Sequence, residues 1–292
     1  MSPDLYVDPA RAWVARERPT TWPGGAGTAV SITFDVDAEL SGAPPQELEL
    51  LEGVPITESD LGRVSEGQYG IRRGLPRILA LLDELRVPAT FFVPGATALR
   101  HPEAIRSIAA AGHEIGHHGH LHLPDHDVEP ARLRDEIELG LAAHEQVVGR
   151  RPYGYRSPSW SLSPTTLELL REHGFRYDSS MMADDRPNEL VHRSSGFSIV
   201  ELAPHWDLDD WPWFPLGNPA PRDPELAFAC WWAALTEAPE EGRHVVYTFH
   251  PEVIGRAHRL PLLRRLLTEV RARDGVWLAP LGEVEQLVRA GA

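Results

Sequence analysis

The apolar residues along this chain form short segments that repeat one design, an amphipathic helix followed by a short apolar strand. A proline or a capping residue opens several of the helices, and a glycine follows some of them, as at Gly112 and Gly174. The helices are expected over 74–86, 102–111, 129–148, 164–173 and 261–273. The strands that follow them are expected over 89–93, 113–116, 153–155, 175–177 and 276–278. With three further apolar runs, at 29–34, 198–202 and 245–249, the pattern predicts seven or eight strands.

Strands that alternate with helices are usually parallel, and they form either a closed barrel or an open sheet. Polar residues stand where the expected strands end, namely Asp35, Asp37, His118, His122, Arg156, Asp178 and His250. In a barrel all these ends meet on one face, whereas an open sheet spreads them along an edge. The pattern therefore favours an α/β fold in which a (β/α) barrel forms a single domain.

Two segments stand apart from this repeat. Residues 1–27 precede the first expected strand and are predicted to be an N-terminal extension, which leaves 28–292 for the barrel domain. The segment 203–224 shows no regular periodicity and is rich in Pro, Asp and Trp. Its large aromatic residues argue against disorder. We expect this Trp-rich segment to be a lid or rim over the site, with a packed structural insertion as the alternative.

Composition removes several kinds of chemistry. All 28 basic side chains are arginine, so no lysine can form a Schiff base, a phosphate-binding P-loop or a kinase-type ion pair. The 43 acidic residues outnumber the 28 basic ones, so the net charge is −15. This acidic balance argues against a nucleic-acid partner. We find neither a signal-peptide pattern nor a long apolar run, and we therefore expect a cytoplasmic protein without a membrane partner.

One motif is typical of zinc sites on helices, but the sequence around it does not predict a helix. The run His113–His117 reads H-E-x-x-H, which on a helix would place two zinc ligands on one face. The preceding helix has already ended at Gly112, and Gly116 would weaken a helix here. We therefore expect a strand, on which the two histidines are not one helical turn apart.

The residues that follow suit a metal better. His118 and His122 are four positions apart, so they would share a face if the chain forms a helical turn there. The pair Asp35 and Asp37 could divide the work, with one carboxylate binding the metal and the other accepting a proton. A solvated turn is the alternative for that pair.

Four motifs in this order carry a family resemblance. They are Thr33–Asp37 (TFDVD), Gly112–His122 (GHEIGHHGHLH), Tyr155–Trp160 (YRSPSW) and Thr248–Pro251 (TFHP). The chain resembles the polysaccharide deacetylases of the NodB-homology type over about residues 28–285. The resemblance implies a distorted (β/α) barrel that hydrolyses N-acetyl amides with a divalent metal, commonly zinc.

The resemblance also assigns roles to residues. The metal ligands it implies are Asp37, His118 and His122. The catalytic residues it implies are Asp35 as general base, Arg156 as the residue that orients this base, and His250 as general acid. A carboxylate could hold His250 protonated, for which Asp207, Asp210 and Asp178 are the candidates. We expect Trp160, Trp211 and Asp210 to line the substrate pocket.

Some positions depart from the usual family pattern, and they leave the substrate open. Val36 separates two aspartates that are usually adjacent, and His117 and Gly119 stand where the family usually has other residues. These features resemble a branch with peptidoglycan-deacetylase-like proteins, cyclic-imide hydrolases and metal-independent allantoinases.

Three functions therefore remain open. The first is N-deacetylation of an acetylated sugar or related small amide. The second is ring opening of a cyclic amide or imide. The third is a non-catalytic carbohydrate-binding barrel, in which Trp160, Trp206 and Trp211 would serve as stacking surfaces. The expected partner is a small-molecule or carbohydrate substrate, and the pattern is compatible with a monomer or a homo-oligomer.

Overall fold

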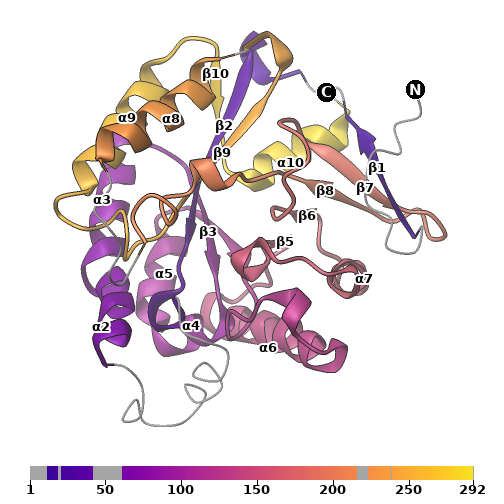
Figure 1. Ribbon diagram of the computed structural model, residues 1–292. Helices are drawn as coiled ribbons and strands as arrows, with labels where there is room; N and C mark the ends of the chain where they lie inside the picture. The colour runs from indigo at the N-terminus through magenta and orange to yellow at the C-terminus, as the bar shows by residue number, and fades with distance from the viewer. Residues whose placement is uncertain (1–11, 19–20, 42–60, 216–222, 238, 292) are drawn as a thin grey trace.

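The computed structural model describes residues 12–18, 21–41, 61–215, 223–237 and 239–291 (Figure 1). Its strands are β1 (Trp13–Glu17), β2 (Thr28–Asp35), β3 (Thr90–Val93), β4 (Glu114–His117), β5 (Gly154–Tyr155), β6 (Tyr177–Asp178), β7 (Asn188–His192), β8 (Ser198–Glu201), β9 (His244–Phe249) and β10 (Val276–Leu278). Its helices are α2 (Leu61–Tyr69), α3 (Leu75–Leu85), α4 (Gly95–Arg100), α5 (Pro102–Ala110), α6 (Pro130–Val148), α7 (Pro164–His173), α8 (Pro224–Thr236), α9 (Leu260–Ala272) and α10 (Leu281–Ala290).

These strands form one sheet in the order β1-β7-β8-β6-β5-β4-β3-β2-β10, and β9 also pairs with β2. The eight strands from β2 to β6 and from β8 to β10 pair in parallel, as the alternation with helices predicts. β1 and β7 were not expected, and both pair antiparallel. β1 lies within the predicted N-terminal extension.

Strand β2 shows why this sheet curls into a barrel. Its outward residues Val30, Ile32 and Phe34 are fully buried in the core that α3, α8 and α9 cover. Figure 1 shows these three helices side by side. Full burial of such a side chain stabilises the fold by about 1.5–3 kcal/mol.

The inward face of β2 meets other strands across the interior. Ala29 shares one apolar cluster with Phe92 of β3, Tyr177 of β6, Val200 of β8 and Val246 of β9. Residues of five strands can pack on one another in this way only if the sheet closes around them. A parallel bridge between Asp209 and Thr248 joins the segment after β8 to β9. The fold is therefore the predicted distorted (β/α) barrel.

No helix among the described residues is both long enough and apolar enough to span a lipid bilayer.

Candidate active site

A cavity of about 300 Å³ opens at the carboxyl ends of the barrel strands. Its lining residues are Asp35, Asp37, Ser41, His118, His122, Pro124, Ser159, Trp160, Trp206, Asp209, Trp211 and His250. The sequence predicted most of the polar members of this set from their positions at strand ends. The parallel strands therefore bring the predicted residues together on one face.

Three of these residues form a set that fits a divalent cation. One ligand atom from each of Asp37, His118 and His122 lies within 4.8 Å of the other two. The Nε2 atoms of His118 and His122 lie 3.6 and 3.4 Å from the carboxylate oxygens of Asp37. The Asp37 Oδ1 atom is buried without a hydrogen-bond partner among the described residues. An unpartnered carboxylate oxygen beside two imidazole nitrogens suits zinc or a similar ion.

The histidine pair is positioned by a loop, because the helical turn considered for residues 118–122 does not form. Gly119 and His122 adopt left-handed backbone angles, with φ of 70° and 60°, and the rings of His118 and His122 still lie 5.0 Å apart. The Glu136 carboxylate accepts hydrogen bonds from the backbone N–H groups of His120 and Leu121, at 2.9 and 2.6 Å. This side chain satisfies backbone donors that a helix would otherwise satisfy.

Arg156 holds the carboxylate of Asp35. Its Nη1 atom donates to Asp35 Oδ1 at 2.7 Å and to Thr33 Oγ1 at 2.9 Å, and its Nη2 atom donates to Ser179 Oγ at 3.0 Å. The guanidinium is fully buried and lies 4.2 Å from the ring centre of Phe92. Burial would raise the pKa of Asp35, but the charges of Arg156 and the nearby imidazoles outweigh burial and lower this pKa.

The backbone of Arg156 also orients His118, a predicted metal ligand. The Nδ1 atom of His118 lies 2.7 Å from the Arg156 carbonyl oxygen. Because a carbonyl only accepts, Nδ1 carries the proton, and the lone pair of His118 is on Nε2, which faces Asp37. One residue therefore fixes both the predicted base and a predicted metal ligand.

Asp210 holds both the side chain and the backbone of His250. Its Nδ1 atom lies 2.7 Å from Asp210 Oδ1, and its backbone N–H donates to the same carboxylate at 3.1 Å. Burial would lower the pKa of His250, but the carboxylates of Asp209 and Asp210 outweigh burial and hold this pKa well above its usual value. These carboxylates therefore favour the protonated imidazole.

The other two candidates for this supporting carboxylate lie elsewhere. The Asp207 side chain is exposed and lies 3.5 Å from His205, and Asp178 accepts from Ser180 at 2.8 Å. Asp210 itself is fully buried and is not among the described lining residues. Of these two adjacent aspartates, Asp209 lines the pocket, and Asp210 supports the histidine from outside the pocket.

Three tryptophans form an aromatic wall at this cavity. The ring centres of Trp160 and Trp206 lie 4.2 Å apart, and Trp211 lies 5.6 Å from the His250 ring. Ser159 and Trp160 have φ of 53° and 52°, a backbone conformation that costs non-glycine residues energy and is common at functional sites. Trp206 was expected to face a ligand only in the non-catalytic alternative, yet it lines the cavity beside Trp160.

The Trp-rich segment combines both predicted roles. Trp206 and Trp211 lie at the rim of the cavity, whereas Phe214 is buried against Trp231 of α8. The segment is therefore part rim and part packed insertion. Residues 216–222 of the predicted range lie outside the described residues.

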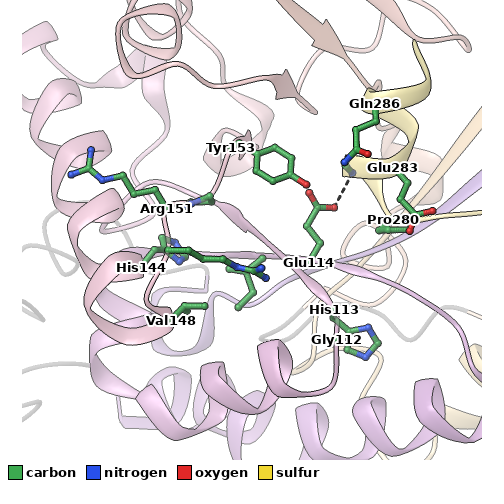
Figure 2. A pocket seen from close by; sticks show the side chains of 14 residues that line it. Gly112, His113, Glu114, His144, Val148, Arg151, Tyr153, Pro280, Glu283 and Gln286 are labelled. Atoms are coloured by element: carbon green, nitrogen blue, oxygen red, sulfur yellow. Dashed lines mark hydrogen bonds between the residues drawn. The ribbon is translucent and has the colours of Figure 1, made fainter. Parts of the chain in front are cut away.

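The H-E-x-x-H motif lies at β4, on a strand as expected, and it is not part of the cavity described above. Its Glu114 lines a second cavity of about 320 Å³ at the amino-terminal ends of the strands (Figure 2). There its carboxylate accepts from the backbone N–H of Gly282 at 2.9 Å and from the Thr90 hydroxyl at 2.7 Å. His117 lies apart, against the ring of Tyr155. The motif does not form a zinc site here, because His113 and Glu114 line this second cavity whereas His117 does not.

Comparison with known proteins identifies the family. The family model for polysaccharide deacetylases matches residues 67–177. A chitooligosaccharide deacetylase of Sinorhizobium fredii is 42% identical over 150 residues, which are 44% of this chain and 68% of the relative. A peptidoglycan deacetylase of Helicobacter pylori is 26% identical over 250 residues, which are 76% of this chain and 85% of the relative.

Solved structures extend the similarity to nearly the whole chain. A Mycobacterium smegmatis protein assigned to the polysaccharide deacetylases superposes with a TM-score of 0.84 at 42% identity, over 94% of both chains. The allantoinase Puue superposes with a TM-score of 0.81 at 24% identity, again over 94% of both chains, and shares the fold. The site and fold define a barrel hydrolase with a candidate metal centre. The chain belongs to the polysaccharide deacetylase family.

Proposed function

We propose that this protein is a metal-dependent hydrolase that removes the acetyl group from an N-acetylated sugar or a related small amide. The observation that carries the proposal is the meeting of three elements in one cavity. They are a carboxylate held by Arg156, an imidazole held by Asp210 and the set Asp37, His118 and His122. The relatives named as peptidoglycan and chitooligosaccharide deacetylases support it.

The geometry suggests how these residues divide the reaction. A divalent ion on Asp37, His118 and His122, for which zinc is our expectation, would polarise the acetyl carbonyl and acidify the attacking water. Asp35 is ionised, and its Oδ1 accepts from Arg156, which leaves Oδ2 to accept the proton of that water. As the C–O bond forms and the C–N bond breaks, His250 donates a proton from Nε2 to the departing amine, because Nδ1 is engaged by Asp210.

The cavity lining favours a neutral substrate with flat faces. Its described ionisable residues are three aspartates and three histidines, and it includes no arginine. Because no guanidinium lines the cavity to pair with an anionic group, we do not expect a highly anionic polymer to bind there. Trp160 and Trp206 offer aromatic surfaces of the kind that stack on sugar rings.

Acetate release tests the proposed reaction. The zinc-loaded protein would be incubated with N-acetylglucosamine oligomers and, separately, with a hydantoin and a cyclic imide. We expect acetate from the sugars, its loss after chelation, and its return when zinc is added. Opening of a cyclic ring without any acetate from the sugars would instead favour the allantoinase- or imidase-like alternative.

The Asp210→Asn variant tests the acid assignment. It removes the negative charge next to His250, so the pKa of this imidazole should fall. Since His250 must be protonated to act as acid, the alkaline limb of the kcat/KM profile should move to lower pH by about one unit or more. Asp207→Asn, at an exposed position, is the matched control and should leave the profile in place. An unchanged alkaline limb in Asp210→Asn would exclude Asp210 as the partner.

A further inference from the structure

Three glycines bring one helical segment into backbone contact with the loops that carry the proposed catalytic residues. The segment consists of α2 and the π-helical turn Gly70–Gly74 that joins it to α3. A Cβ atom on Gly67 would lie 2.5 Å from the carbonyl carbon of Ala38. A Cβ atom on Gly74 would lie 2.7 Å from the carbonyl carbon of Pro251. No side chain fits at either contact.

The backbone conformation does not require glycine here. Gly74 has φ of −64° and ψ of −59°, which any L-residue adopts. Alanine is the better helix former, so local propensity would favour alanine at these positions. The reason for glycine is therefore the close approach of the two loops.

Each contacted residue is next to a residue of the proposed site. Ala38 follows Asp37, and its own φ of 56° places its carbonyl against Gly67. Pro251 follows His250. The helical segment thus touches the metal-ligand loop at one end and the acid loop at the other.

The middle glycine adds a third contact to the acid loop. A Cβ atom on Gly70 would lie 2.7 Å from Oε2 of Glu252, a fully buried carboxyl group. Arg77 of α3 also donates to the Gly255 carbonyl at 3.2 Å and to the Tyr69 hydroxyl at 2.6 Å. The segment is therefore fastened to the acid loop by polar contacts as well as by packing.

We propose that Gly67, Gly70 and Gly74 are positioning residues that set the two loops relative to each other through one rigid helical segment. Gly67 fixes the position of the loop that carries Asp37. Gly70 and Gly74 fix the position of the loop that carries His250. This inference rests on the proposed function, because it assigns these loops to the metal and to the acid. Misplacing a reacting group by about 1 Å can cost about 100-fold in rate, so a contact that fixes two loops affects catalysis directly.

The two ends of the segment can be tested separately. Gly67→Ala should weaken zinc affinity about tenfold or more in a chelator competition, because Asp37 moves. Gly74→Ala should leave zinc affinity within about twofold and lower kcat about tenfold or more, with KM changed much less, because His250 moves. Gly70→Ala, which meets a side-chain oxygen, is the milder substitute for Gly74→Ala if the latter does not fold.

The control is Gly282→Ala, which introduces a close contact with side chains at the other end of the barrel. There a Cβ atom would lie 2.6 Å from Oε1 of Glu114. We expect a lower Tm in this variant with zinc affinity and kcat unchanged. If the Gly67 and Gly74 variants change only Tm, as this control does, the positioning role is wrong. The same conclusion follows if both variants alter zinc affinity and kcat in the same way.

Amide hydrogen exchange provides a readout that does not depend on activity. Gly67→Ala should speed exchange at Leu40 and Ser41, whose N–H groups bond to the carbonyls of Asp37 and Ala38. Gly74→Ala should speed exchange at Val253 and Ile254, whose N–H groups bond to the carbonyl of His250. A wild-type protein that releases no acetate would contradict the proposed function alone. Unchanged exchange in both loops would contradict the positioning role alone.

Discussion

Replacing Asp35 by asparagine is expected to lower kcat for acetate release by about 1,000-fold while the protein still binds zinc. General acid–base catalysis typically contributes about 100- to 10,000-fold, and an amide oxygen cannot take a proton from water at neutral pH. The asparagine can still accept the hydrogen bond from Arg156, so the fold of the site should persist. Steady-state kinetics together with metal analysis of the purified variant measure both effects.

The isosteric change at the neighbouring aspartate is the natural comparison. Asp37→Asn removes a charge from the proposed ligand set, so it should lose zinc affinity as well as activity. Near-normal kcat in Asp35→Asn would refute the base assignment. Loss of zinc from Asp35→Asn would show instead that Asp35 binds the metal.

Replacing His118 by alanine is expected to remove bound zinc and, with it, nearly all activity. Loss of a residue that only supports a ligand costs about 10- to 100-fold in metal affinity, and loss of the ligand itself should cost at least as much as the upper end of that range. Titration with zinc against a chelator and acetate release at saturating zinc measure the two losses.

His126→Ala serves as the control for this change. His126 lies in the same part of the chain but is exposed and outside the proposed ligand set. The zinc affinity and kcat of the His126→Ala variant should match those of the wild type. Full zinc occupancy in His118→Ala would contradict the proposed triad.

The sequence predicted the barrel and most of the site because both depend on local patterns. Helix ends and short apolar runs predict where each strand ends. Parallel strands bring their carboxyl ends to one face of the barrel. The sequence alone therefore places Asp35, Asp37 and His250 near one another. The role of Arg156 came from the family resemblance, and the structure gives its physical basis in the contact with Asp35.

Other parts of the site depend on contacts between distant residues, which no local pattern reveals. The helical turn considered for residues 118–122 does not form, and Glu136, on a separate helix, accepts hydrogen bonds from backbone N–H groups of this loop. Asp210 was one of three candidates to support His250, and only the path of the chain after β8 decides between them. Strands β1 and β7 were missed because their pairing is antiparallel and joins distant segments.

The double contact made by Arg156 has a consequence for protein engineering. Its side chain holds Asp35, but its main-chain carbonyl holds His118, and every amino acid at this position retains a carbonyl. A saturation library at position 156 would therefore vary the environment of the proposed base Asp35 while it preserves the backbone contact to the proposed metal ligand His118. Such a library offers a way to retune the working pH range of the enzyme without rebuilding its proposed metal centre.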